Sequence, residues 1–473
     1  MNRKKIKRII HNLEKVYNLN KIEEIARKHQ FIRRKGKITA KCFLNLCTFL
    51  GEDLCSMSLH NLCAKLESNE KVSISSQALS KRFNKEAVSF LKKVFHEMLN
   101  FQNEVLRNNE SLLKSYFNRI TIVDATGFKL DDKHEYKCKG SGVKSSVKIQ
   151  LQYDLLTGEF IHCELKEGSY SDASYLETLQ STIQKHDLIL KDLGYLKALD
   201  LKVIDEMEAF YVSRVKVITV LYKKEEVTGY GKKGNLVKTD WYLPINIKEL
   251  LEPLAEGETI EINDIYIGNT TKNRTKCRLI LTKLTEECKL KKQIRNKNPS
   301  NRCSTKVIGK NKWWLELNCY MTNIPKEVLS KEKIYETYSM RWQIEIMFKI
   351  WKSLFKIHDV KKAGLERIQC FIYGRLIMLL LTSSIVFTAR IINYSKSGEE
   401  LSEIKSFGIV KQYFNELYRN IFKSKIALYL IFCRILTTIK LHGKKSVKKG
   451  KRTTVLILEG IKISQLSLEK LVS

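Results

Sequence analysis

The pattern of apolar and polar residues changes near residue 116. Residues 1–115 have a helical pattern throughout, whereas from residue 119 the apolar residues gather in short β-branched runs. RITIVDATGF predicts a strand that ends on Asp124, and VKIQLQYDLLTG and EFIHCELKEG predict two strands joined by a Thr157-Gly158 turn. A helix in DASYLETLQSTIQKH, a strand ending on Asp192 and a strand in AFYVSRVKVITV follow. This mixed order predicts an α/β fold.

All four prolines lie between residues 244 and 325, where alternating patterns such as TIEINDIYIG and CRLILTKL predict strands. Proline disrupts helix interiors and central strands, so its absence elsewhere favours long helices and central strands there. We therefore expect a separate β-rich module from about 220 to 325. A long helix from about Lys326 to Lys356 is expected after it.

The charge of the chain indicates its partner. Its 473 residues include 85 Lys and Arg but 51 Asp and Glu, which gives a net charge of +34. Hydrophobic residues make up 43%, enough for real cores, which excludes a disordered basic tail protein. A folded chain with this charge needs a polyanion, so nucleic acid is the first expectation and an anionic membrane the second.

Secretion and membrane insertion are not expected. The basic start has no apolar stretch long enough for a signal peptide. The apolar segment from Phe371 to Thr388 is interrupted by Arg375, so it predicts a buried core helix. The twelve cysteines include no C-x-x-C and no histidine pattern to complete a zinc site, which favours reduced thiols in a cytosolic protein.

Two carboxylates each follow an apolar strand, Asp124 in ITIVDATG and Asp192 in LILKDLGY. A charge beside a strand interior is costly unless it is paired or binds a metal. Each aspartate alone is equally well explained as a turn cap. Two of them, each followed closely by a glycine, favour a metal site.

The segment YETYSMRWQIEIMFKIWKSLFKI has one narrow polar stripe. At about 100° per residue, Tyr338, Arg341, Glu345 and Lys352 lie within roughly 60° of arc on an otherwise apolar helix. A structural ion pair between Arg341 and Glu345 is the alternative, but it leaves the other two residues unexplained. The stripe suits a glutamate at a metal, flanked by groups that hold a phosphate backbone.

The segment SISSQALSKRFNKEAVSFLKKVFHEML offers Ser75 or Ser76 as an N-cap. Lys81 and Arg82 would then lie near the start of a helix that reads a DNA groove. An ordinary amphipathic helix with a solvated basic face is the equal alternative.

These residues together resemble the DDE transposases of the insertion-sequence-four family, which includes the Tn-five-like enzymes. Y-x2-R-x3-E-x6-K matches the family signature, as do DATG, D-x-G-Y, FYVSRVK and YMTNIP. The resemblance implies an RNase H-like core at 116–222 and 326–392, interrupted by a β-rich insertion at 223–325. Outside this core, we expect a helical DNA-binding region at 1–115 and a helical basic region at 393–473. Leu193 departs from the family, in which many members carry Arg.

The resemblance also implies a function, cut-and-paste DNA transposition in the bacterial cytoplasm. Asp124, Asp192 and Glu345 would hold two Mg²⁺ ions, with Mn²⁺ as the substitute. The partners would be the terminal inverted repeats, target DNA and a second copy of the chain, without a membrane. Phosphate contacts are expected from Tyr338, Arg341 and Lys352, and from the basic runs Lys289–Lys312 and Lys440–Arg452.

Trp313 and Trp314 are two further candidates, because by the same resemblance one of them could stack on a base flipped out near the element's end. The alternative is structural, because adjacent tryptophans that begin a strand are often one core residue and one exposed ring. Two rival functions stay open beside transposition. They are a metal nuclease that cuts DNA without joining strands and a catalytically inactive DNA-binding derivative, which the complete acid triad disfavours.

Overall fold

The computed structural model describes residues 3–107, 116–171, 180–192, 198–230, 236–270, 273–296, 311–360, 363–446 and 452–461. Contacts divide the chain into two compact units. Unit 1 comprises Met1–Leu112, Asp124–Tyr170 and Gln343–Lys451, and unit 2 comprises Leu113–Val123, Ser171–Trp342 and Arg452–Ser473. Each unit is thus assembled from separate stretches, and the boundaries differ from the five consecutive segments that the sequence predicts.

The N-terminal part of unit 1 is helical, as predicted. Asn18, Thr39, Ser58 and Ser75 each cap a helix by accepting a hydrogen bond from a backbone N–H three residues later. These short polar side chains fix where four of the helices start. The helices are α1 (Arg3–Val16), α2 (Leu19–Lys28), α3 (Ala40–Cys47), α4 (Leu59–Glu70), α5 (Ser76–Arg82) and α6 (Lys85–Arg107).

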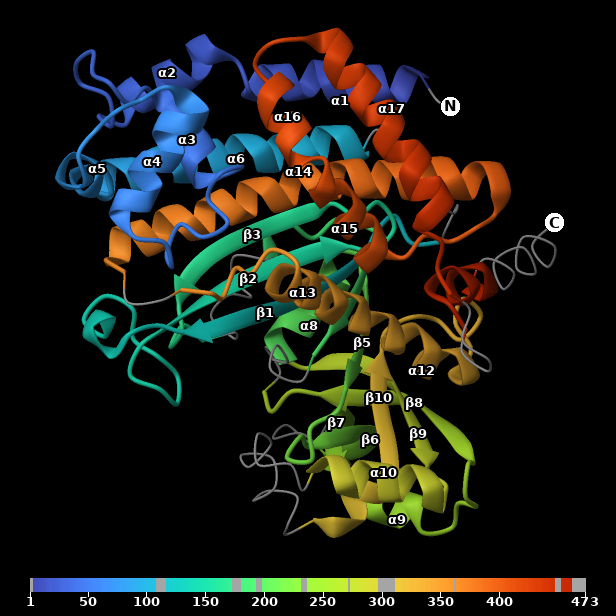
Figure 1. The fold of residues 1–473 in the computed structure, drawn as a ribbon. Helices are drawn as coiled ribbons and strands as arrows, with labels where there is room; N and C mark the ends of the chain where they lie inside the picture. The colour runs from blue at the N-terminus through green and yellow to red at the C-terminus, as the bar shows by residue number, and fades with distance from the viewer. Residues whose placement is uncertain are drawn as a thin grey trace. The chain divides into compact units, whose positions relative to one another are not determined.

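A buried helix, α14 (Leu365–Ser397), is the centre of unit 1 and packs along α6 (Figure 1). It is long and apolar enough to cross a membrane, but its most apolar window is completely buried. Arg375 is 2% exposed and donates to the carbonyl of Thr48. The predicted buried core helix is therefore confirmed. The remaining helices of unit 1 are α13 (Gln343–Ser353), α15 (Glu403–Gln412), α16 (Phe414–Asn420) and α17 (Lys425–His442).

Unit 1 also contains β2 (Ser146–Asp154), β3 (Phe160–Glu167) and the second half of β1 (Ile120–Lys129). β2 and β3 form an antiparallel pair around the predicted turn. Gly158 has a φ of +85°, and a Cβ there would lie 2.2 Å from the ring of Phe387. Glycine at this turn therefore lets α14 pack closely on the hairpin.

Unit 2 is built on one long run of strands. The first half of β1 is followed in space by β4 (Leu188–Lys191) and β5 (Phe210–Arg214), all parallel. β10 (Leu317–Thr322) then pairs antiparallel with β5. The sheet continues through β9 (Thr275–Lys283), β8 (Thr259–Ile267), β6 (Leu221–Tyr230) and β7 (Leu236–Pro244).

The pairing of β10 with β5 corrects the expectation of a separate β-rich module. The insertion is β-rich, but its strands extend the core sheet, because β10 returns along β5. The mixed α/β class is confirmed. Three parallel strands beside the β2–β3 antiparallel pair also agree with an RNase H-like core. The helical elements of unit 2 include α8 (Ala198–Glu206), α9 (Ile247–Leu251), α10 (Glu286–Asn296), η4 (Lys312–Glu316) and α12 (Lys331–Ser339).

The predicted helix from Lys326 to Lys356 is not continuous. α12 ends at Ser339, a 3₁₀ turn (η5, Met340–Trp342) follows, and α13 begins at Gln343. The hydrogen-bond pattern tightens in this turn, so a constant 100° per residue does not describe the path from Tyr338 to Lys352. The helix predicted in DASYLETLQSTIQKH falls mainly outside the described residues.

Candidate functional site

Strand register positions the two predicted aspartates. Within unit 2, Val123 of β1 pairs with Lys191 of β4 in a parallel ladder. Asp124 directly follows Val123 in the sequence, and Asp192 directly follows Lys191. Each aspartate therefore comes one residue after the same pair of the ladder. β4 ends at Lys191, one residue before the predicted end at Asp192. β1, in contrast, runs on to Lys129, which corrects the expectation that it ends on Asp124.

In unit 1, Asp124 lies in the continuing β1 strand and is partly buried. Its Oδ1 accepts a hydrogen bond from the backbone N–H of Ala125 at 2.8 Å. Three residues later, the carbonyl of Gly127 accepts a hydrogen bond from Nζ of Lys352 at 3.3 Å. This contact brings α13 to the strand that carries the first aspartate.

α13 lies over this part of β1, and the helix and the strand run in a similar direction (Figure 1). Glu345 precedes Lys352 by seven residues, so it lies on the same helix face, ~10 Å back along the axis. Asp124 precedes Gly127 by three residues, which is also ~10 Å along a strand. The Glu345 face of α13 is therefore directed toward the Asp124 end of the strand.

In unit 2, Asp192 contacts two residues of the predicted stripe. Oδ1 of Asp192 accepts a hydrogen bond from the hydroxyl of Tyr338 at 3.5 Å and lies 3.9 Å from Nε of Arg341. The Asp192 side chain is 41% exposed, whereas Tyr338 and Arg341 are largely buried. Burial, and secondarily the negative charge of Asp192, raises the pKa of Tyr338 to about 12. Tyr338 therefore keeps its proton near neutral pH and remains a hydrogen-bond donor.

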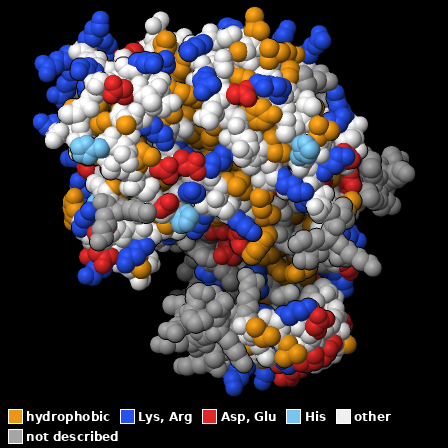
Figure 2. Space-filling model, in the orientation of Figure 1, with side chains coloured by type: hydrophobic (Ala, Val, Ile, Leu, Met, Phe, Trp, Pro, Cys, Tyr) orange, Lys and Arg blue, Asp and Glu red, His pale blue; other side chains and the backbone are white. Residues whose placement is uncertain are grey.

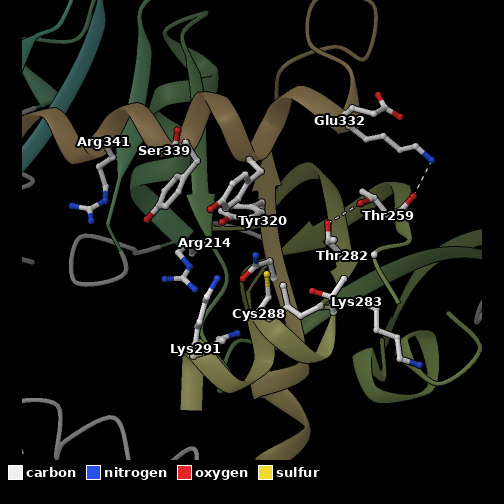
Figure 3. Close-up of a pocket in the computed structure, with 18 of the residues that line it drawn as sticks. Arg214, Thr259, Thr282, Lys283, Cys288, Lys291, Tyr320, Glu332, Ser339 and Arg341 are labelled. Atoms are coloured by element: carbon white, nitrogen blue, oxygen red, sulfur yellow. Dashed lines mark hydrogen bonds between the residues drawn. The ribbon is translucent and has the colours of Figure 1, made fainter. Parts of the chain in front are cut away.

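A cavity of about 780 Å³ opens beside Tyr338 and Arg341, entirely within unit 2. Its walls come from β5, β8, β9, β10, α10 and α12, and Figure 3 shows Arg214 and Arg341 at the same end. Tyr320 and Tyr338 pack their rings 5.1 Å apart on one side. The cavity carries far more positive than negative side chains, with Glu332 as the acid among its lining residues. The cations are Arg214, Lys283, Lys291, Lys292, Lys331 and Arg341.

The three predicted acids come from both units, Asp124 and Glu345 from unit 1 and Asp192 from unit 2. Among the residues that the structure describes, no three His, Cys, Asp or Glu side chains form a group that could hold a metal ion. Each acid nevertheless presents carboxylate oxygens, the ligands that Mg²⁺ prefers. The donor chemistry of each acid thus fits a divalent cation.

Trp313 and Trp314 lie in the 3₁₀ turn η4, ahead of β10. Their rings are 5.3 Å apart in an edge-to-face arrangement, and both are partly buried against the core of the insertion. This packing agrees with the structural alternative in part, because both rings contact the core and neither is the exposed ring it expects. The stacking role of one ring stays a prediction.

Lys81 and Arg82 occupy different positions from those expected. Ser75 is the N-cap, as predicted, but α5 has only seven residues, so both cations lie at its C-terminal end. Lys81 is exposed. Arg82 lies over the ring of Phe31 at 5.8 Å and donates to the Phe31 carbonyl at 3.4 Å. The expectation that both residues lie near the start of the helix is therefore corrected.

The loop between α2 and α3 is a basic surface that the sequence interpretation missed. Its side chains RRKGK, from Arg33 to Lys37, are all exposed. Figure 2 shows Lys and Arg side chains gathered over this segment at the upper left. The loop also approaches α5, since a Cβ on Gly36 would lie 3.3 Å from the guanidinium of Arg82. Four cations without an acid between them, in RRKGK, could have identified this basic surface from the sequence. Residues 297–310 of the first predicted basic run and residues 447–451 of the second, in contrast, lie outside the described residues.

Comparison with known proteins shows the family of this chain. The family described as the transposase DDE domain matches residues 115–381. The transposase for insertion sequence element IS1151 of Clostridium perfringens is 41% identical over 470 residues, 99% of both chains. The transposase for IS231C of Bacillus thuringiensis subsp. berliner is 33% identical over 91% of both chains. A piggyBac transposase in a synaptic complex with hairpin DNA has a TM-score of 0.46 at 9% identity, covering 96% of this chain and 85% of that chain.

Proposed function

Because this chain belongs to the transposase DDE domain family and is thus a DNA transposase, we propose that it moves an insertion sequence by cut-and-paste transposition. It would cleave DNA at the element's terminal inverted repeats and join the freed 3′ ends to target DNA. The observation that carries this proposal is the register of β1 and β4, in which Val123 and Lys191 pair immediately before Asp124 and Asp192.

Asp124, Asp192 and Glu345 are the proposed holders of the divalent cations. Support comes from the shared strand step of the two aspartates and from the contact of Lys352 with Gly127, which turns the Glu345 face of α13 toward β1. Mg²⁺ is the proposed ion, with Mn²⁺ as a substitute, because all three donors are carboxylates. When bound, such cations activate a water or a 3′-hydroxyl and stabilise the leaving oxygen of the phosphodiester.

Arg341, Tyr338 and Lys352 are proposed to hold the DNA backbone beside the acids. Arg341 has the fork of donors that fits a phosphate, and Lys352 offers a point charge on the Glu345 face. Tyr338 is buried and keeps its proton, so it can donate a hydrogen bond to a phosphate oxygen. The Y-R-E-K signature that these residues form supports placing the chain in the insertion-sequence-four family.

The N-terminal helices are proposed to bind the ends of the element, and the bacterial cytoplasm is the proposed site of action. The exposed cations of the α2–α3 loop and Lys81 on α5 support this role, because a basic surface binds DNA phosphates and releases counterions. Two copies of the chain are proposed to hold the two ends together during transposition.

Cleavage tests the proposal with a DNA fragment that carries the inverted repeats flanking the gene. Asp124→Asn, Asp192→Asn and Glu345→Gln each remove a negative charge and keep the side-chain volume. We expect each variant to lose Mg²⁺-dependent cleavage while binding the fragment as the wild type does. Normal cleavage by any one of them would remove that residue from the site.

A strand-transfer assay separates transposition from the rival nuclease. The wild-type protein is given a precleaved end with a free 3′-hydroxyl and a supercoiled target plasmid. We expect joined products, which require the 3′-hydroxyl and disappear with a dideoxy end. Cleavage without any joining would favour the nuclease instead.

A further inference from the structure

The last described segment of the chain, residues 452–461, belongs to unit 2 by its contacts, although unit 1 extends to Lys451. Residues 454–461 are helical. Thr453 caps the start of this helix, because its Oγ1 accepts a hydrogen bond from the backbone N–H of Leu456 at 3.4 Å. The segment is thus a short capped helix of unit 2.

One side of this C-terminal helix is apolar and buried. Val455, Ile457, Leu458 and Ile461 are all buried, whereas Leu456 on the opposite side is 51% exposed. An isolated helix of this length is unstable in water, so it needs packing against the rest of the protein. The buried apolar side chains supply that packing and hold the segment in place.

The C-terminal helix contacts α12 near both of its ends (Figure 1). Nη1 of Arg452 donates to Oε2 of Glu336 at 3.0 Å. At the other end, a Cβ on Gly460 would lie 3.3 Å from Nζ of Lys333. Glycine is disfavoured inside a helix, but here it leaves room for the lysine side chain. Lys333 and Glu336 are i,i+3 neighbours 3.8 Å apart, so the segment lies against one face of α12.

A different face of α12 borders the cavity of about 780 Å³. Tyr335 and Tyr338 line this cavity, whereas Lys333 and Glu336 do not. Empty space offers no packing partner, so the cavity side does little to hold α12 in position. The start of α12 is also weakly fixed, because the side chain of its N-cap, Ser330, makes no capping hydrogen bond. The contact with the C-terminal helix therefore supplies a restraint that the cavity side lacks.

We propose that residues 452–461 form a C-terminal clasp that positions α12, and through it Tyr338 and Arg341, for DNA cleavage. The inference rests on the proposed function, in which these two side chains hold the DNA backbone. Arg452 and Glu336 are then positioning residues. Their ion pair is partly exposed, so it contributes little to fold stability. A displacement of ~1 Å at the reacting groups can nevertheless cost ~100-fold in rate.

Two leucines of the C-terminal clasp provide a test and its matched control in the full-length protein. Leu458→Asn should detach the clasp because Leu458 is buried, whereas Leu456→Asn should not because that side chain is exposed. Amide hydrogen exchange is measured first, without DNA. Leu458→Asn should exchange faster in residues 331–339 as well as in 454–461, because α12 opens more easily once the clasp is detached. Faster exchange in 454–461 alone would overturn the proposal.

Cleavage at saturating DNA then tests the link to function. The Mg²⁺-dependent rate of Leu458→Asn should fall at least ~10-fold, because the groups on α12 and η5 are misplaced. Leu456→Asn should keep the wild-type rate. The DNA affinity of Leu458→Asn in EDTA should change by less than about threefold, because the substitution removes no positive charge. A wild-type rate in Leu458→Asn with a loosened α12 would overturn the proposal.

A charge exchange decides the matter if Leu458→Asn does not fold. Arg452→Glu and Glu336→Arg each bring like charges together, so each should lower the cleavage rate without a change in melting temperature. The double variant restores opposite charges and should recover most of the rate. Single variants that cleave at the wild-type rate, or a double variant no faster than the slower single one, would overturn the proposal.

Failure of the proposed function gives a different result. The exchange measurement needs neither Mg²⁺ nor cleavage, so it reports on the C-terminal clasp alone. A wild type that cleaves no DNA, although Leu458→Asn loosens residues 331–339, would contradict the proposed function and leave the contact between the clasp and α12 standing.

Discussion

Nε of Arg341 lies 3.9 Å from Oδ1 of Asp192, although 149 positions separate the two residues along the chain. An ion pair with Glu345, four residues away, is the structural alternative that the sequence offers for Arg341. The 3₁₀ turn at Met340–Trp342 and the end of β4 give Arg341 a carboxylate from a different element. An arginine beside a proposed metal-binding acid is well placed to hold the phosphate that the metal would engage.

Arg341→Ala should abolish cleavage with little loss of fold stability. Asp192 is 41% exposed, so the ion pair contributes about 1 kcal/mol or less to the free energy of unfolding. Arg341→Lys should remain defective because a point charge cannot replace a bidentate grip. Thermal melting and a cleavage assay on the same variants distinguish the two roles. A purely structural role predicts that the free energy of unfolding falls by ~3–5 kcal/mol and that activity is lost only in proportion to unfolding.

Charge reversal should separate Lys81 from Arg82. Lys81 is exposed, so Lys81→Glu should weaken DNA binding and leave the melting temperature unchanged. Arg82 packs on Phe31, so Arg82→Glu should lower the melting temperature as well. Arg34→Glu in the α2–α3 loop should behave like Lys81→Glu. Affinity for the element's end and for random duplex is measured in the full-length protein. Equal losses on both DNAs would reduce this surface to a phosphate contact.

DNA affinity should fall as pH rises above about 8. The pKa of Lys292 is lowered to about 8 by burial and by Arg214, while Cys319 acts in the opposite direction. Lys292 is charged below this pH and neutral above it, so attraction for phosphate decreases as the pH rises through that value. Its hydrogen bonds to Trp314 and Leu317 survive, because a neutral amine still donates. Binding titrations from pH 7 to 9.5 should show this fall in the wild type and a smaller one in Lys292→Met.

Gly374→Ala should destabilise unit 1 by ~1–3 kcal/mol through overpacking. A Cβ at Gly374 would lie 1.9 Å from the carbonyl oxygen of Cys47, so α14 could not keep its distance from α3. Gly408→Ala in α15 is the matched control. A Cβ there meets nothing within 4 Å, and alanine in a helix interior should stabilise by ~0.5–1 kcal/mol. Denaturant unfolding of both variants measures the difference, and equal changes would contradict this account of α14 packing.

The sequence by itself determined much of this protein. The spacing of apolar residues and the Thr157-Gly158 pair predicted the helical N-terminus, the hairpin turn and the buried helix around Arg375. These features depend on residues that are close together in the sequence. The charge excess pointed to nucleic acid, and the spacing of Tyr338, Arg341, Glu345 and Lys352 led to the transposase family before any fold was known.

Only the tertiary structure decided which distant residues meet. Pairing between strands far apart in the chain extends the core sheet through β10 and places Arg214 on the strand next to the one that Asp192 follows. The contact of Arg341 with Asp192 likewise joins distant segments. Strand register is set by packing and ladder hydrogen bonds, which no single segment contains. The helix break at Met340–Trp342 could not be predicted from the sequence either. Apolar spacing indicates which residues are buried, but it does not indicate which backbone hydrogen bonds form.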